Sequence, residues 1–331
     1  MNALKILMVF FILAASLHAY KLYAVKKGIY DIPSERSSHT RPVIRGGGII
    51  FVLAVLMAVF AKYRAFLTPK GLAFITGFLL LSFTGFLDDK KNLTPQVRFP
   101  FQVVSAILIL YAAGLWESSI PLWLQLTAFV VAIGFINAYN FMDGINGITG
   151  LYSIVLILTL WYLNRLHALV PDTIFLYLLI ALLIFGYFNF RKQALMFAGD
   201  VGSMSLAAVL LFLLSKFMIE LQSPALLLTV AVYGVDSAMT IIFRLLQKEN
   251  IFRAHRWHVY QKMVDRYGLS HLQTALIYAL LQAIINSAII LTRAYALPLK
   301  TQEKIIFLSI LFLVFIYIFI QKDKLLKKEP H

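Results

Sequence analysis

Two adjacent carboxylates open the polar segment DDKKNLTPQVRFPFQ and are the first candidates for chemistry in this chain. Asp88 and Asp89 end a long apolar stretch, where a carboxylate is costly and usually functional. Neighbouring side chains on a helix diverge by about 100°, so the pair predicts two different roles, one toward a metal or phosphate and one toward a basic partner. Arg98 follows ten residues later and could hold an anion. The structural alternative is the start of a solvated loop.

A second carboxylate lies between glycines in the segment FAGDVGS. Asp200 is placed there at the start of another apolar stretch. Small neighbours allow close backbone approach, and the exposed amides of a helix N-terminus suit phosphate oxygens. Carboxylate oxygens also suit a hard cation. The structural alternative is an N-cap for a helix over residues 203–219.

The segment NAYNFMDGINGITG carries four polar side chains at three-residue intervals. They are Asn137, Asn140, Asp143 and Asn146. This spacing keeps them near one helix face, although the glycines at 144 and 147 indicate that the helix ends here. Amides and a carboxylate on one face could ligate a metal or hydrogen-bond a nucleobase. Polar packing between membrane helices is the alternative.

Two basic segments complete the set. RAHRWHVYQK contains Arg253, His255, Arg256 and His258, and it favours a phosphate clamp over a zinc site because the chain has no cysteine. If this segment is helical, its two histidines share a face. A basic loop that binds lipid headgroups is the alternative.

The second basic segment, DIPSERSSHTRPVIRGGG, contains His39 and Arg45 before three glycines. The glycines predict a backbone left open for a bulky polar ligand.

The elements that must position these residues are membrane helices. The chain has 331 residues, of which 61% are hydrophobic and 14% charged, whereas soluble domains are roughly 45–50% apolar and about 25% charged. We therefore predict an all-α polytopic integral membrane protein with one domain over residues 1–331. The net charge of +15 fits cytoplasmic loops near anionic headgroups better than a nucleic-acid partner.

Apolar windows predict about eleven (10–11) transmembrane helices near residues 4–24, 47–66, 71–87, 99–116, 122–138, 148–164, 172–189, 203–219, 224–243, 272–291 and 303–321. The first is expected to be an uncleaved span, because basic residues follow it, whereas a signal peptide carries its positive charge in front. With the N-terminus outside, the connections assigned to the cytoplasm hold twenty-one of the thirty Lys and Arg residues, as the positive-inside rule requires. The polar segments then lie on the cytoplasmic face.

Oxygen ligands for Mg²⁺, Arg and His for phosphates, and a membrane location together indicate phosphoryl-group chemistry on a lipid. A transporter or flippase is the main alternative, but it would place its charges near the bilayer midplane and show repeat symmetry, which this sequence does not. A structural membrane scaffold with solvated loops is the other alternative.

In order along the chain, HTRPVIRGGG, GFLDD, NAYNFMDGINGITG, FAGDVGS and HRWHVYQ resemble the motifs of the polyprenyl-phosphate N-acetylhexosamine-1-phosphate transferases, glycosyltransferase family 4. The resemblance covers residues from about 31 to 271. It implies transfer of a sugar-1-phosphate from a UDP-N-acetylhexosamine to undecaprenyl phosphate in the bacterial plasma membrane, with release of UMP. It also allows a homodimer.

Carried over by motif position, the resemblance implies Asp200 as the principal Mg²⁺ ligand and Asn140 as a second, with Mn²⁺ as an alternative ion. It implies catalytic roles for Asp143 and His258, and leaves open whether Asp88 or Asp89 acts as a base. The candidate substrate-binding residues are His39, Arg45, Arg98, Asn137, Asn146, Arg253, His255 and Arg256.

This chain departs from the family pattern at two places. Asn146 occupies the uracil-contacting position, where many members have Asp. The segment HRWH differs from the HHH pattern of the peptidoglycan enzyme and is closer to enzymes that initiate O-antigen and other surface polysaccharides. The resemblance therefore disfavours the peptidoglycan substrate and leaves the identity of the sugar open. Asp236 and Arg244 also match the bacterial glycan-initiating branch.

Overall fold

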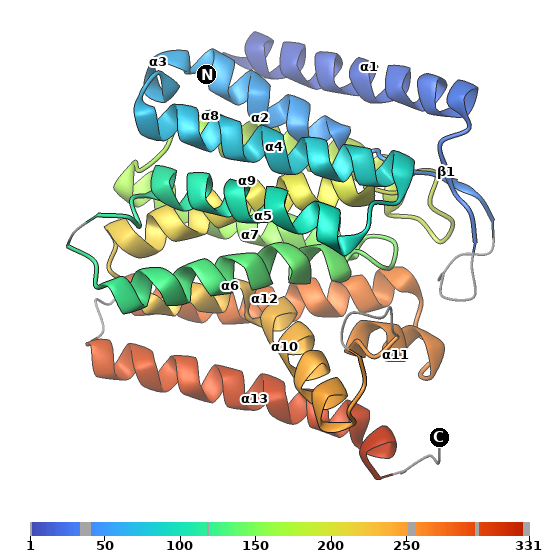
Figure 1. Ribbon diagram of the computed structural model, residues 1–331. Helices are drawn as coiled ribbons and strands as arrows, with labels where there is room; N and C mark the ends of the chain where they lie inside the picture. Colours follow the sequence, from blue (N-terminus) through green and yellow to red (C-terminus); the bar gives the residue numbers. More distant parts are fainter. Residues whose placement is uncertain (1, 34–40, 118, 251–255, 295–297, 327–331) are drawn as a thin grey trace.

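The protein is a bundle of long apolar helices, as a computed structural model shows for residues 2–33, 41–117, 119–250, 256–294 and 298–326 (Figure 1). The helices are α1 (Ala3–Lys27), α2 (Ile49–Ala61), α3 (Tyr63–Phe66), α4 (Pro69–Lys91), α5 (Pro95–Ala113), α6 (Leu122–Phe141), α7 (Ile148–His167), α8 (Asp172–Asn189), α9 (Gly199–Glu220), α10 (Ala231–Leu246), α11 (Val259–Asp265), α12 (His271–Ala294) and α13 (Leu299–Leu326). A 3₁₀ helix, η1 (Pro224–Val230), precedes α10, and the strands β1 (Tyr30–Asp31) and β2 (Val43–Ile44) pair antiparallel.

Each of the eleven predicted spans coincides with a helix. Within the described residues, ten helical segments are long and apolar enough to cross a membrane, whereas α2 has only 13 residues. The sequence prediction of an all-α polytopic membrane protein is confirmed. The predicted second span, 47–66, is interrupted at Lys62, where the backbone leaves the helical region before the short helix α3.

Helix α9 is the centre of the bundle. It packs against α2, α4, α5, α6 and α7, and 78% of its apolar window is buried, compared with 17% for α1 and 11% for α13. Figure 1 accordingly shows α1 and α13 along opposite edges of the molecule. A helix that is apolar on all sides needs such an enclosed position, so the N-terminal residues of α9 are held in the interior of the bundle.

Helix α10 crosses the bundle obliquely in Figure 1, after the 3₁₀ segment η1. Such a break leaves backbone groups unpaired, which is costly in hydrocarbon. Gln282 from α12 satisfies two of them, because its side-chain oxygen accepts from Val232 N at 3.0 Å and its amide nitrogen donates to Leu228 O at 2.7 Å. A buried amide thus stabilises the bent span.

Two of the differences between the helix boundaries and the predicted spans concern the acidic residues. Helix α4 continues to Lys91, so Asp88 and Asp89 lie within its last turns and not in the predicted connection after residue 87. Helix α9 begins at Gly199, four residues before the predicted start, so Asp200 lies in its first turn. Hydropathy ends a span where charge begins, whereas these helices continue because their charges have partners.

Candidate active site

Asp89 caps the N-terminus of α9 through its side-chain carboxylate. Its two oxygens accept from Asp200 N at 2.8 Å and from Val201 N at 3.0 Å, and its side chain is only 2% exposed. These amides are among the donors that an α-helix leaves unpaired at its start. The predicted alternative, that Asp200 is itself the N-cap, is therefore wrong: Ala198 occupies that position, and the capping carboxylate comes from α4.

Asp88 points toward α5. Its carboxylate accepts from Leu93 N at 2.6 Å and from an Arg98 guanidinium nitrogen at 2.6 Å. Asp88 therefore stabilises the turn between α4 and α5, while Asp89 stabilises the start of α9. The adjacent aspartates have different partners because successive side chains diverge on a helix, but each also pairs with an arginine. The predicted division, one toward a metal or phosphate and one toward a basic partner, stays a prediction.

Arg45 joins two of the carboxylates. Its Nε lies 2.6 Å from Asp89 Oδ1, and one terminal nitrogen lies 3.3 Å from Asp200 Oδ2. Although burial lowers it, the carboxylates of Asp200 and Asp89 raise the pKa of the Arg45 guanidinium, which therefore stays charged. Asn92, which the sequence did not single out, accepts from another Arg45 nitrogen at 3.4 Å.

Asp200 is the most exposed of the three carboxylates. Its side chain is 18% exposed, against 6% for Asp88 and 2% for Asp89. Arg98 reaches the same Asp200 oxygen as Arg45, at 3.8 Å. Three aspartates and two arginines thus form one cluster, which we call the carboxylate cluster, at the end of the bundle where α4 ends and α5 and α9 begin.

The three glycines at 46–48 pack closely against residues 197–202, and this packing places Arg45 at the carboxylate cluster. Gly47 N and Gly48 N donate to the carbonyl oxygens of Phe197 and Ala198, each at 2.9 Å. A Cβ on Gly48 would lie 2.0 Å from the Cα of Gly202. The prediction that these glycines leave the backbone open for a ligand is wrong, because Tyr20, residues 196–198 and the first turn of α9 fill that space.

The donor set suits a hard divalent cation at Asp200. Mg²⁺ prefers carboxylate and amide oxygens, and Asp200 is the carboxylate that backbone donors do not occupy. Asn140 lies on α6, which packs against α9, and its buried side-chain nitrogen has no hydrogen-bond partner in the described part of the chain. No group of three or more His, Asp or Glu residues forms a ready metal site within those residues, and the pairing of Asp200 with Asn140 as metal ligands stays a prediction.

The rest of the asparagine segment is divided between two tasks. Asn137 exchanges two 3.2 Å amide hydrogen bonds with Gln102 of α5, which is the helix-packing role considered for this segment. Asn146 donates to the carbonyl oxygens of Arg191 and Lys192 at 3.0 and 3.3 Å. Its amide nitrogen therefore holds the loop before α9, and a uracil contact would have to use its oxygen.

Asp143 lies after the end of α6, in the loop that leads to α7. Thr149 donates to its carboxylate at 2.7 Å. Burial raises the pKa of Asp143 to about 6, Asp89 adds to this increase and Arg45 opposes it. Asp143 therefore lies within electrostatic range of the carboxylate cluster and is ionised at neutral pH.

His258 is buried, with Nδ1 3.3 Å from Asp236 Oδ1. Asp236 also accepts from Val259 N at 3.1 Å and from the Tyr278 hydroxyl at 2.6 Å. Asp236 thus links α10, the start of α11 and α12, a partnership that the sequence could not indicate.

Of the remaining basic candidates, only Arg256 lies in the described part of the chain. Arg256 forms an ion pair with Asp265 at 2.8 Å, while His39, Arg253 and His255 lie outside the described residues. Helix α11 begins after His258, and the predicted helical face shared by His255 and His258 includes a residue outside the described part of the chain.

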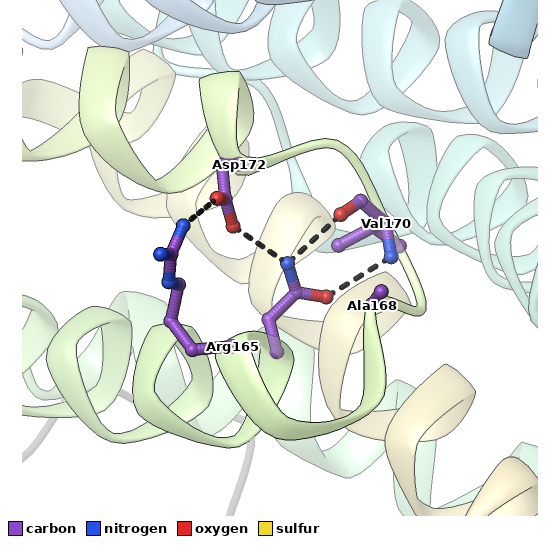
Figure 2. Close-up of a pocket in the computed structure, with 5 residues that line it drawn as sticks. Arg165, Ala168, Val170 and Asp172 are labelled. Atoms are coloured by element: carbon purple, nitrogen blue, oxygen red, sulfur yellow. Dashed lines mark hydrogen bonds and ion pairs between the residues drawn. The ribbon is translucent and has the colours of Figure 1, made fainter.

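A pocket of about 220 Å³ lies between α7 and α8 (Figure 2). Asn164 pairs with Val170 through both side-chain atoms and donates to Asp172 at 2.8 Å. Arg165 forms an ion pair with the other oxygen of Asp172 at 2.8 Å. These contacts hold the α7–α8 turn together. By the alternation of the helices this turn lies at the opposite end of the bundle from Asp200, so we do not assign it to the active site.

Comparison with known proteins connects the carboxylate cluster to a family. The sequence model of glycosyl transferase family 4 matches residues 71–218, the part of the chain that includes α5 and nearly all of α4 and α9. A Bacillus subtilis (strain 168) protein named "Probable undecaprenyl-phosphate N-acetylglucosaminyl 1-phosphate transferase" is 28% identical over 293 residues, which are 83% of this chain and 80% of the relative.

Two further relatives are similar over shorter or more divergent alignments. The undecaprenyl-phosphate alpha-N-acetylglucosaminyl 1-phosphate transferase of Yersinia pestis is 24% identical over 317 residues, which cover 85% of this chain and 81% of the relative. The phospho-N-acetylmuramoyl-pentapeptide-transferase of Streptococcus uberis is 28% identical over 221 residues, which cover 58% and 66%. The membrane helices, the three aspartates and Arg98 within the matched segment, and these relatives agree: the chain is a membrane enzyme similar to the members of glycosyl transferase family 4.

Proposed function

We propose that this enzyme transfers an N-acetylhexosamine-1-phosphate from a UDP-sugar to undecaprenyl phosphate and releases UMP. The reaction would take place on the cytoplasmic face of a bacterial plasma membrane and initiate O-antigen or another surface polysaccharide. Relatives named for undecaprenyl phosphate and N-acetylglucosaminyl 1-phosphate support the acceptor and the transferred group. The observation that carries the proposal is the carboxylate cluster at one end of α4, α5 and α9.

The reaction needs positioning and charge neutralisation more than a covalent catalyst. An oxygen of the lipid phosphate would attack the β-phosphorus of the nucleotide sugar and form a new diphosphate bond. The bond from that phosphorus to the bridging oxygen would break, and its electron pair would leave with UMP. The guanidinium groups of Arg45 and Arg98 are suited to bind the phosphate oxygens.

We assign Asp88 and Asp89 to positioning and not to proton abstraction. Backbone amides and guanidinium groups already donate to both carboxylates at 2.6–3.0 Å. The acceptor also needs little help from a base, because a phosphate monoester has a second pKa of about 6 and is mostly a dianion at neutral pH. The two aspartates instead hold Arg98, Arg45 and the start of α9.

A divalent metal ion would be held by Asp200 and Asn140. Mg²⁺, or Mn²⁺ in its place, would when bound neutralise charge on the diphosphate and orient it. The oxygen donors and the partly exposed carboxylate of Asp200 support this assignment.

The experiment is an assay of UMP release by membranes that contain the full chain. UDP-GlcNAc, UDP-GalNAc, UDP-QuiNAc and UDP-FucNAc would each be offered with and without undecaprenyl phosphate, and with Mg²⁺ or a chelator. We expect UMP from at least one sugar, only when lipid phosphate and metal are both present. UMP release without the lipid, or full activity of Asp200→Asn, would contradict the proposal.

Peptidoglycan precursor synthesis is the second candidate, because of the similarity to the Streptococcus uberis enzyme. The segment HRWH, in place of three consecutive histidines, disfavours it. UDP-MurNAc-pentapeptide therefore belongs in the same panel of donors, and its use in preference to the four UDP-N-acetylhexosamines would select this candidate.

A further inference from the structure

One oxygen of Asp200 is shared by two guanidinium groups. Arg45 approaches Asp200 Oδ2 at 3.3 Å and Arg98 approaches it at 3.8 Å. Each arginine also has a much closer carboxylate on α4, at 2.6 Å in both pairs. The arginines are thus anchored on α4 and reach Asp200 only through long contacts.

Asp88 and Asp89, the two carboxylates of α4 that bind these arginines, also accept hydrogen bonds from backbone amides. Asp89 is fixed by two amides of α9, and Asp88 by the amide of Leu93. Within the described residues, the side chain of Asp200 accepts from Arg45 and from no backbone amide, and it is the most exposed of the three. The cluster therefore contains two fixed carboxylates and one whose counter-ions can be exchanged.

We propose that Arg45 and Arg98 act as exchangeable counter-ions of Asp200 in the substrate-free enzyme. When a divalent cation binds Asp200, their outer nitrogens turn from that carboxylate to the diphosphate of the nucleotide sugar, while the contacts to Asp88 and Asp89 persist. This inference rests on the proposed function and adds an ordered exchange of charges within the same site.

Charge balance supports the exchange. When all three aspartates are ionised, they and the two arginines together carry one negative charge, which repels a diphosphate. A divalent cation changes this balance to one positive charge, which attracts it. A cation on Asp200 also repels a guanidinium group about 4 Å away, and a diphosphate offers that group the paired oxygens that its planar fork prefers. Metal and nucleotide should therefore strengthen each other's binding, by the same factor in each direction.

The exchange predicts opposite effects for one substitution. Arg45→Gln removes a cation that competes for Asp200, so the substrate-free protein should bind metal about fivefold more tightly. The same change removes a diphosphate ligand, so UDP-GlcNAc should bind about tenfold more weakly in the presence of metal. Arg45→Lys keeps the charge but not the planar fork, so it should leave metal affinity unchanged and weaken only nucleotide binding.

The test uses the full chain, purified in detergent, with Mn²⁺ as the probe. Free Mn²⁺ is measured by electron paramagnetic resonance without nucleotide, and UDP-GlcNAc binding is measured by calorimetry without lipid acceptor. Arg165→Gln is the matched control, because it breaks an Arg–Asp pair of the same kind at the other end of the bundle and should change neither affinity. Arg98→Gln provides the second variant should Arg45→Gln fail to fold.

Tighter Mn²⁺ binding with weaker nucleotide binding in either glutamine variant supports the exchange. Weaker or unchanged Mn²⁺ binding overturns it and makes the arginines simple supports of the carboxylates, and so does the absence of Mn²⁺ binding by the unaltered protein. Failure of the proposed function is a separate result: it is the absence of lipid-dependent UMP release, whatever the Mn²⁺ titration shows.

Discussion

At the scale of single residues, Asp89 and Asp200 show how surroundings give one side chain two tasks. Asp89 is almost fully buried and accepts two backbone amides of α9. Asp200 is partly exposed, and its hydrogen-bond donor is a guanidinium group. A buried acceptor that satisfies amides contributes to folding, whereas a carboxylate with exchangeable partners is available to a ligand.

Substitution by asparagine should separate these tasks. Asp89→Asn should lower the free energy of unfolding by roughly 1–3 kcal/mol, because its amide group would face a backbone N–H that then lacks an acceptor. Asp200→Asn should change that free energy by less than about 1 kcal/mol, since no backbone donor loses its partner, while UMP release falls at least about 100-fold. Unfolding in detergent and UMP release measure the two effects, and equal losses of stability would refute the distinction.

At the scale of elements, the contact between α2 and α9 determines where Arg45 lies. The glycine segment at 46–48 runs against residues 197–202, and Gly48 and Gly202 meet backbone to backbone. Small residues permit such close approach of membrane helices. The glycines therefore act on the site indirectly, by setting the distance between β2 and the first turn of α9.

Gly48→Ala should disturb both the packing and the activity. Its methyl group would lie 2.0 Å from the Gly202 backbone, and relieving an overpacked contact typically costs about 1–3 kcal/mol. We expect a lower unfolding temperature and strongly reduced UMP release. Gly134→Ala on α6 is the control, because a Cβ there meets nothing within 4 Å; an equal loss in that variant would show that the effect is not due to the close contact.

At the scale of the whole molecule, the ends of the bundle differ in chemistry. The carboxylate cluster, the small β-sheet and α11 lie at one end, and the α7–α8 turn with its satisfied Asp172 lies at the other (Figures 1 and 2). The proposed lipid acceptor and nucleotide donor must both reach the first of these ends. The orientation of the helices therefore decides on which side of the membrane the reaction takes place.

The absence of cysteine allows a direct test of orientation. Ser119→Cys and Gln193→Cys would each introduce one thiol at an exposed position, in the α5–α6 and α8–α9 connections respectively. With the N-terminus outside, a membrane-impermeant maleimide should label position 119 in intact spheroplasts, and position 193 only after permeabilisation. The reverse pattern would place the carboxylate cluster on the outer face.

The sequence by itself determined the membrane class, the ten long apolar helices of the described residues and the candidate residues of the carboxylate cluster. Long apolar runs have few alternatives to a helix in lipid, and adjacent residues such as Asp88 and Asp89 diverge by helix geometry alone. Only the tertiary structure decided which residues these side chains and glycines contact. Asp89 caps a helix 112 residues away, and Gly48 meets Gly202, because contacts between distant helices depend on how those helices pack. The same reason explains why the role of the glycine segment was misjudged: local pattern shows that a backbone is accessible, but packing decides what fills the space.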